Sequence, residues 1–86
     1  NLEKLMETKQ QVREFIVENF LFGDTKPLEN DSMSLLDNGI MDSVGVMELV
    51  AFLEGDLGLT VNDDELVPEN LDSVDNLTKF IVSKRG

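Results

Sequence analysis

The sequence contains neither cysteine nor histidine. The absence of cysteine excludes disulfides and thiolate metal ligands, and it fits a reducing cytoplasm. The absence of histidine removes the residue that most often activates a serine, so nothing obvious can make Ser43 a nucleophile that attacks substrates. We therefore expect a protein that is not an enzyme.

Aromatic residues, proline and long apolar runs are also scarce. There are five phenylalanines and two prolines, but no tryptophan or tyrosine. No apolar stretch reaches the roughly 18 residues that span a membrane, and the charged, amphipathic N-terminus does not resemble a signal peptide. The chain starts at Asn1 rather than Met, as it would if upstream residues had been removed. We expect residues 1–86 to form a single cytoplasmic domain.

Basic residues are missing from the middle of the chain. No Lys or Arg occurs between Pro27 and Thr78, and the net charge of the whole chain is −11. This charge disfavours nucleic acids and anionic membranes as partners. The same stretch contains thirteen acids, namely Glu29, Asp31, Asp37, Asp42, Glu48, Glu54, Asp56, Asp63, Asp64, Glu65, Glu69, Asp72 and Asp75. Two interpretations stay open, a solvated surface that maintains solubility and a docking surface for basic partners.

A chain this rich in Asp and Asn must also be tested for a calcium loop. The EF-hand pattern needs glycine at its sixth position. With Gly39 in that position, Ser34, Leu36 and Gly45 fall at positions one, three and twelve, so three required oxygen ligands are missing or unsuitable. The acids after Asn62 fit the first turn of a short helix better than an ion site. We expect no metal site.

Apolar spacing predicts helices and gives no sign of strands. Steps of three and four predict an amphipathic helix over residues 2–20. A long connection over residues 21–42 follows, and connections of this length are commonly functional. A second helix is predicted from about Ser43 to Gly55, apolar on several sides.

Two shorter helices complete the predicted order. Asn62 can cap a short helix in which Glu65 reaches back, and Pro68 ends it and extends the backbone at Val67. A last helix is capped by Asp72 or Ser73 and continues to the end of the chain. The fold class predicted from the residues is all-α.

Ser43 is the most informative residue of this arrangement. By itself, Asp42-Ser43 is an ordinary pair of helix-capping residues. Its place after a glycine-containing loop and before an apolar helix would present the hydroxyl to solvent beside a carboxylate. A serine presented in this way without a base suits an acceptor of a covalent group that another enzyme attaches.

The run from Ser34 to Ser43 (Ser-Leu-Leu-Asp-Asn-Gly-Ile-Met-Asp-Ser), followed by Met47-Glu48-Leu49, resembles the acyl carrier protein family. The likeness continues through residues 53–66 and 68–77 and covers nearly the whole chain. It implies a four-helix bundle with a short third helix and a long loop between helices one and two. It also implies that a phosphopantetheinyl transferase attaches 4′-phosphopantetheine to Ser43, and that the thiol of this arm holds cargo as a thioester.

The resemblance carries further expectations about partners and about the interior. Acids for partner recognition fall on Asp42, Glu48, Glu54 and Asp56. Cargo would face an interior formed by Val44, Met47, Leu49, Val50, Leu53, Val61, Leu66, Leu71, Leu77, Phe80 and Ile81, which must also be core. Expected partners are the transferase and acyl or aminoacyl ligases or synthases with basic docking faces. We expect a monomeric, freestanding carrier, with fatty acid biosynthesis and lipid metabolism as its setting.

Two positions differ from the fatty-acid carriers of this family. Val44 replaces the usual Leu after the serine, and Gly45 stands where an acid is usual, although glycine within a helix costs about 1 kcal/mol relative to alanine. These features are more similar to D-alanyl or other aminoacyl carriers. A D-alanyl carrier for cell-envelope modification and an acidic helical module that only binds basic partners therefore remain as alternatives.

Overall fold

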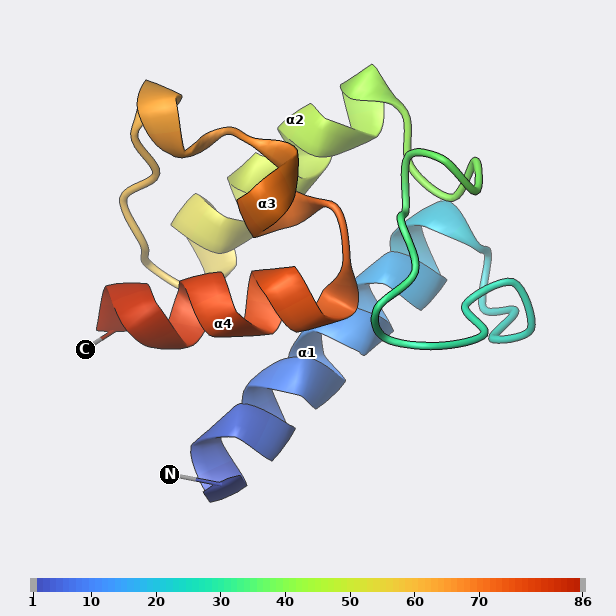
Figure 1. The fold of residues 1–86 in the computed structure, drawn as a ribbon, viewed down its shortest axis with the longest axis horizontal. Coiled ribbons are helices and arrows are strands. Elements are labelled where there is room, and N and C mark those ends of the chain that lie inside the picture. Colours follow the sequence, from blue (N-terminus) through green and yellow to red (C-terminus); the bar gives the residue numbers. More distant parts are fainter. Residues whose placement is uncertain (1, 86) are drawn as a thin grey trace.

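The structure, a computed structural model, describes residues 2–85, and within this part of the chain it is helical without strands (Figure 1). The predicted all-α fold with a short third helix is confirmed. The elements in chain order are α1 (Leu2–Phe20), α2 (Ser43–Ala51), the π-helical turn η1 (Phe52–Asp56), the 3₁₀ turn η2 (Asp63–Glu65), α3 (Pro68–Leu71) and α4 (Val74–Arg85).

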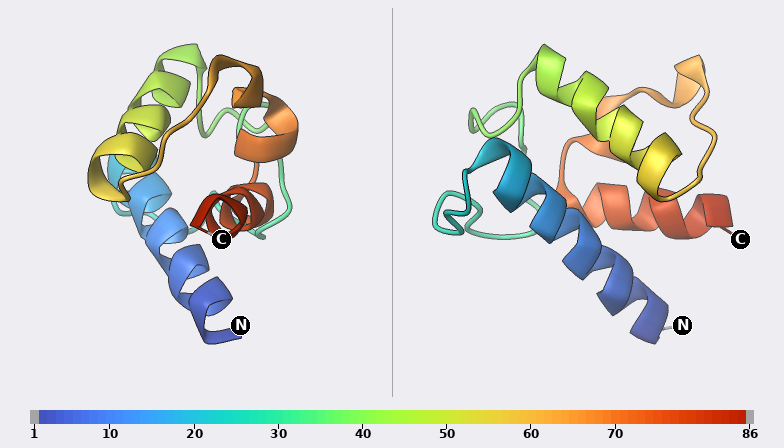
Figure 2. Two further views of the ribbon diagram at one scale, coloured as in Figure 1. Left: turned by 90° about the vertical axis from the view of Figure 1, so that its left-hand side faces the viewer. Right: turned by 180° about the vertical axis from the view of Figure 1, so that it is seen from behind.

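The helices pack around one apolar core. Helix α4 crosses and contacts α1, and α3 packs against α4 (Figure 1). The first turns of α1 extend beyond the other helices in both views of Figure 2, and there Leu2 and Met6 are 71% and 63% exposed. The predicted helix is therefore correct, but only its later turns bury their apolar stripe. The buried core consists of Val12, Ile16, Leu28, Leu35, Ile40, Met41, Leu49, Leu53, Leu71, Val74, Leu77, Phe80 and Ile81.

The second helix changes character before its predicted end. Regular α-helix stops at Ala51, and Leu57 N–H then donates to Phe52 O at 3.2 Å, five residues back. This wider turn lets Leu53 be fully buried while the Phe52 ring stacks on Phe15, with centroids 4.3 Å apart. Packing across the bundle thus sets the end of this helix, in keeping with the contacts that aromatic pairs prefer.

The third helix lies further along the chain than expected. Glu65 reaches back to accept from Asn62 N–H at 2.9 Å, as predicted, but the segment it closes is only a single 3₁₀ turn. Val67 is extended as predicted, and Pro68 begins α3 rather than merely ending the turn before it. Proline suits a first helical position because its missing N–H would have no acceptor there.

An ion pair fixes this 3₁₀ turn to the last helix. Lys84 Nζ lies 2.8 Å from Glu65 Oε1. The hydrogen bond from Lys84, together with the one from the backbone of Asn62, holds the pKa of the Glu65 carboxyl below its usual value.

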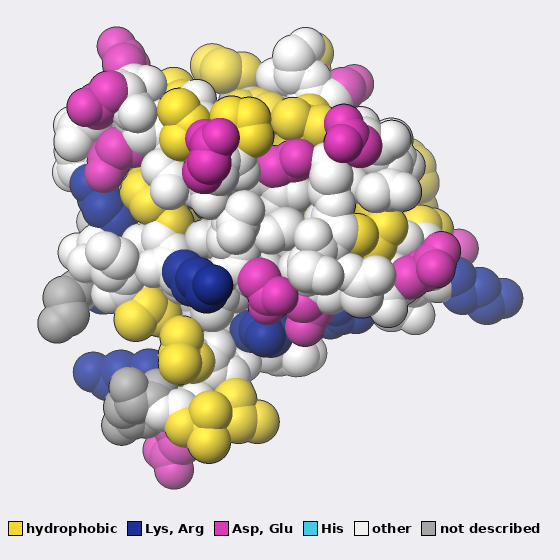
Figure 3. Space-filling model, viewed as in Figure 1, with side chains coloured by type: hydrophobic (Ala, Val, Ile, Leu, Met, Phe, Trp, Pro, Cys, Tyr) yellow, Lys and Arg dark blue, Asp and Glu magenta, His cyan; other side chains and the backbone are white. Residues whose placement is uncertain are grey.

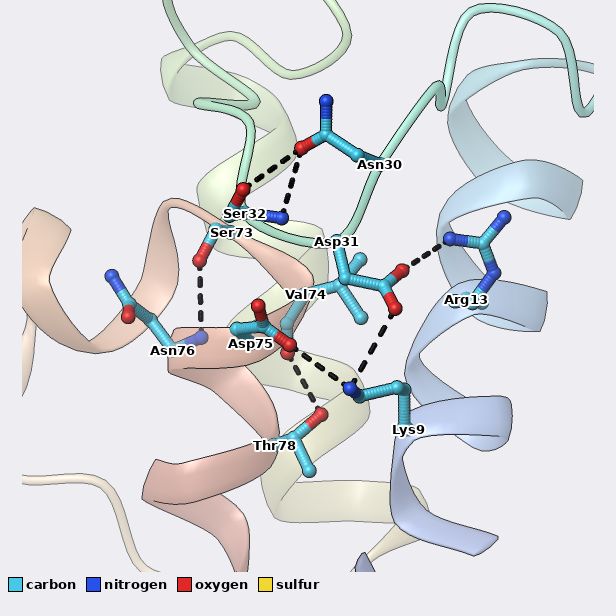
Figure 4. Close-up of polar contacts among 10 residues, drawn as sticks. All are labelled: Lys9, Arg13, Asn30, Asp31, Ser32, Ser73, Val74, Asp75, Asn76 and Thr78. Carbon is cyan, nitrogen blue, oxygen red and sulfur yellow. Dashed lines mark hydrogen bonds and ion pairs between the residues drawn. The ribbon is translucent and has the colours of Figure 1, made fainter. Parts of the chain in front are cut away.

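The connection between α1 and α2 is fastened to both neighbouring helices through Asp31 (Figure 4). Its carboxylate pairs with Arg13 and, at 3.6 Å, with Lys9, both on α1. Its backbone carbonyl accepts from Asp75 N–H at 2.9 Å, at the start of α4. Lys9 also lies 3.0 Å from Asp75, and this hydrogen bond raises the pKa of Lys9 above its usual 10.5. The long connection is therefore a packed segment with fixed contacts.

The last helix is capped by Ser73, whose hydroxyl accepts from Asn76 N–H at 3.0 Å (Figure 4). Of the two predicted caps, Ser73 is thus the one that the structure uses. The carboxylate of Asp72 contacts the segment before α2 instead.

Candidate functional site

Ser43 is the first residue of α2 and is exposed. Its hydroxyl makes no hydrogen bond to any of residues 2–85. Asp42 is the N-cap, and its Oδ1 accepts from Gly45 N–H at 2.7 Å. Since no hydrogen bond joins the Asp42 carboxylate to the Ser43 hydroxyl, Asp42 is not placed as a base for the serine in this structure.

The start of α2 suits a phosphate group. The first N–H groups of a helix have no intrahelical acceptors, and the helix dipole makes this end partly positive. A phosphoryl group on the Ser43 oxygen would lie at this end, as anions at helix N-termini do. The exposed hydroxyl and the polarity of the helix therefore fit the prosthetic group that the family resemblance implies.

The segment before Ser43 is held by Asp72, from the turn between α3 and α4. Its Oδ1 accepts from Leu36 N–H at 2.8 Å, its Oδ2 accepts from the Ser34 hydroxyl, and its carbonyl accepts from Leu35 N–H at 2.8 Å. The buried Leu35 then accepts from both Ile40 and Met41 N–H at 2.9 and 3.1 Å. Sequence reasoning missed this role, because the partners are 36 and 38 residues apart and Asp72 resembles a helix cap.

Gly45 has a packing reason to be glycine. It is buried, and a Cβ built on it would lie 2.9 Å from Met41 Cγ and 3.2 Å from Phe20 Cε1. The side chains of Met41 and Phe20 thus crowd this position, and any side chain placed here would have to displace them. The acid that is usual here in fatty-acid carriers would require such a shift.

Alanine at Gly45 and at Gly55 should have opposite effects. At Gly55 nothing lies within 4 Å of the added Cβ, so Gly55→Ala should stabilise the fold by about 0.5–1 kcal/mol through the unfolded chain and helix propensity. In Gly45→Ala the same gain is outweighed by overpacking, which costs about 1–3 kcal/mol, so this variant should be less stable than wild type. Urea unfolding of both variants measures this, and two effects of the same sign would contradict the packing argument.

The four predicted recognition acids have different surroundings. Asp42 caps α2, and Glu54 Oε2 accepts from Val61 N–H at 3.2 Å. Glu48 and Asp56 are exposed. In Figure 3 hydrophobic and acidic side chains gather along the upper edge of the face, where α2 lies, and basic side chains lie lower.

The residues expected to face the interior divide into two groups. Leu49, Leu53, Leu71, Leu77, Phe80 and Ile81 are buried, and Val50 and Val61 are half-buried. Leu66 is instead 40% exposed, and Val44 and Met47 are 66% and 68% exposed.

The placement of Val44 and Met47 on the outside has a geometric cause. Gly45, Leu49 and Leu53, four residues apart, direct their face of the helix to the core. Val44 and Met47, one and four residues after Ser43, then lie on the side of α2 that faces solvent. The expectation that both are interior is corrected in this respect.

Within residues 2–85 no group of three or more acidic side chains is positioned to hold a metal ion. In the same part of the chain no helix combines the length and the apolar character needed to cross a bilayer.

Comparison with known proteins agrees with this geometry. Residues 10–81 match the family described as "Phosphopantetheine attachment site". A D-alanyl carrier protein of Bacillus pumilus (strain SAFR-032) is 39% identical over 56 residues, which cover 65% of this chain and 69% of that protein. The chain belongs to the phosphopantetheine-attachment family, whose prosthetic group is covalently bound 4′-phosphopantetheine.

It follows that the protein is a carrier and not an enzyme, and that it works with transferases and ligases. The alternative of an acidic module that only binds basic partners is not supported. A setting in fatty acid biosynthesis is not confirmed, because the similar protein from Bacillus pumilus is a D-alanyl carrier.

Proposed function

We propose that Ser43 is the attachment residue, and that residues 1–86 act as one carrier domain for a small aminoacyl group. The observation that carries this proposal is the exposed Ser43 hydroxyl, without a hydrogen bond, at the first residue of α2. When bound, phosphopantetheine supplies a thiol that holds the cargo as a thioester. The residues of the chain present the serine, polarise its surroundings and fix the segment before it.

The small cargo, D-alanyl in particular, is supported by two observations. One is the similarity to the D-alanyl carrier protein of Bacillus pumilus. The other is the close contact at Gly45, which disfavours the acid that is usual in fatty-acid carriers. Leu53, Leu71 and Leu77 are buried, and protein interiors are densely packed, so a long acyl chain would have to displace core side chains.

The wild-type chain should gain the mass of one arm when it is incubated with coenzyme A, magnesium and a promiscuous phosphopantetheinyl transferase. Fragmentation of the product should locate the added mass at Ser43. Loading of a long acyl group should then leave the melting temperature unchanged if the interior does not receive cargo. A chain that stays unmodified while another carrier is loaded would contradict the attachment proposal, and a raised melting temperature would favour a fatty-acyl cargo.

Recognition by partners is proposed to use the acids of α2 and η1, chiefly Glu48 and Asp56, against basic faces of the transferase and the ligase. Reversing the charge in Glu48→Lys replaces attraction by repulsion, so the transferase kcat/KM should fall about ten-fold at low salt. The effect should lie mainly in association and should shrink as salt is added. Assays of arm transfer at low and high salt measure it.

The matched control is Glu7→Lys, the same substitution at an exposed position on α1. It changes the net charge equally but lies in the part of α1 that extends beyond the bundle. Equal slowing by the two variants would mean that only total charge matters, and the acidic surface would then serve solubility.

A further inference from the structure

A groove runs between α1 and α2 and begins beside Ser43. Its first part has a volume of about 270 Å³. The residues that line it are Asn19, Phe20, Gly39, Ile40, Asp42, Val44, Gly45 and Glu48, so both neighbours of Ser43 in the chain lie at its edge. Ser43 itself is not among the lining residues, but a flexible group attached to it would lie next to this groove.

The groove continues along both helices. Asn19 and Glu48 also line a second part, together with Phe15, Ala51, Phe52 and Asp56. A third part shares Phe15, Phe52 and Asp56 with the second and extends to Glu14 and Glu18. Because neighbouring parts share these residues, the three parts lie next to one another along α1 and α2.

The lining combines an apolar floor with an acidic rim. The stacked rings of Phe15 and Phe52 form the floor of the middle part. Glu48, Asp56 and, further on, Glu14 and Glu18 form the rim, and no Lys or Arg is among the described residues that line the three parts. Asn19 donates through Nδ2 to Phe15 O at 2.9 Å, which leaves its side-chain oxygen as an acceptor.

This chemistry matches an arm with amide groups and a cargo with a positive charge. An amide N–H can donate to Asn19, and methyl groups can cover the rings. An aminoacyl thioester keeps a free ammonium group, whereas a simple acyl thioester has no charge. Carboxylates with no Lys or Arg beside them attract such an ammonium group, although each exposed ion pair contributes only a weak attraction.

We propose that the groove between α1 and α2 receives the prosthetic arm, and that its acidic rim binds the ammonium group of an aminoacyl cargo. This inference rests on the proposed function, because it requires attachment at Ser43. It places the cargo on the outer surface between α1 and α2 rather than in the interior expected from the sequence.

The location of the arm can be tested with a nitroxide label on its thiol. Because the chain has no cysteine, a thiol-reactive label attaches only to the arm. In protein whose single arm is verified by mass, the amide signals of Asn19, Ala51 and Asp56 should lose most of their intensity. Those of Asn76 and Lys79, which line a separate groove between α3 and α4, should keep theirs. Stronger loss at Asn76 and Lys79, or no selective loss, would overturn the proposal.

A second test compares two variants that each add a phenylalanine ring, one inside the groove between α1 and α2 and one outside it. Ala51 is exposed and lines the middle of the groove, so Ala51→Phe should narrow it and restore the signals of Asn19 and Asp56. Ser83→Phe adds the same ring at an exposed position in the α3–α4 groove and should leave the losses unchanged. Circular dichroism of both variants checks the fold. Equal losses in wild type and Ala51→Phe would count against the groove.

The charge preference can be tested with arms that carry an alanyl or a propionyl group through a stable amide bond. The two differ only in the amino group. The groove-bound population should be about two- to five-fold higher for alanyl, and the double variant Glu48→Gln/Asp56→Asn should remove that difference. The control Glu69→Gln/Asp63→Asn removes two exposed acids elsewhere and should preserve it.

Equal populations for the two cargoes would overturn the role of the rim. The outcomes also separate the two proposals. Protein that never gains an arm contradicts the proposed function, whereas protein that gains it but keeps its label out of the groove contradicts only this inference.

Discussion

Ser43→Ala should abolish attachment of the prosthetic arm while leaving the protein folded. The arm forms its bond to the serine oxygen, and alanine has none. The fold should persist because Ser43 is exposed and its hydroxyl makes no hydrogen bond to residues 2–85. Intact-mass analysis after incubation with coenzyme A and a transferase should show the unmodified mass, and the urea midpoint should match that of wild type.

The control for this variant is Ser83→Ala, which removes another exposed serine hydroxyl, near the end of α4. It should gain one arm at the wild-type rate. If Ser43→Ala still gained an arm, the attachment residue would lie elsewhere and the proposed function would need a different serine.

Asp72→Ala should destabilise the fold and loosen the segment that leads to Ser43. The variant leaves Leu36 N–H and the Ser34 hydroxyl without their carboxylate acceptor. Hydrogen bonds to charged groups are the stronger ones, so we expect a loss of about 1–3 kcal/mol in the free energy of unfolding. For a domain of this size, the melting temperature should fall by about 4–8 °C for each kcal/mol lost. Thermal unfolding measures the loss, and hydrogen exchange should show faster exchange at Leu36, Ile40 and Met41.

Asp37→Ala is the appropriate comparison, because Asp37 is an exposed acid in the same segment. Its carboxylate accepts no hydrogen bond from residues 2–85, so its removal should change stability by less than about 0.5 kcal/mol. Equal destabilisation by the two variants would show that the segment responds to charge and not to the contacts of Asp72.

The structural predictions made from the sequence are correct where residues close together in the chain determine the structure. The bounds of α1 follow from its apolar spacing. The hydrogen bond from Asn62 N–H to the Glu65 carboxylate joins residues only three positions apart, so it could also be predicted. The extended backbone at Val67 follows from the proline after it.

The misses share a different cause, which is contact between distant residues. The π-helical turn after Ala51 accompanies the stacking of Phe52 on Phe15, 37 positions earlier, and no local pattern predicts this contact. The outward placement of Val44 and Met47 could not be inferred because α2 is apolar on several sides. The side that faces the core is the one that carries Gly45, Leu49 and Leu53, and Phe20 of α1 packs against it at Gly45.

The two attachments of the long connection, through Asp31 and Asp72, have a consequence for protein engineering. Both join residues 30–36 to residues 72–75, which lie at the start of α4 and in the turn before it, more than 30 positions later in the sequence. A chimera that exchanges only the serine-bearing helix between carriers would separate it from the contacts that position it. The transferable module is therefore discontinuous, and a graft should bring residues 30–51 together with residues 72–75.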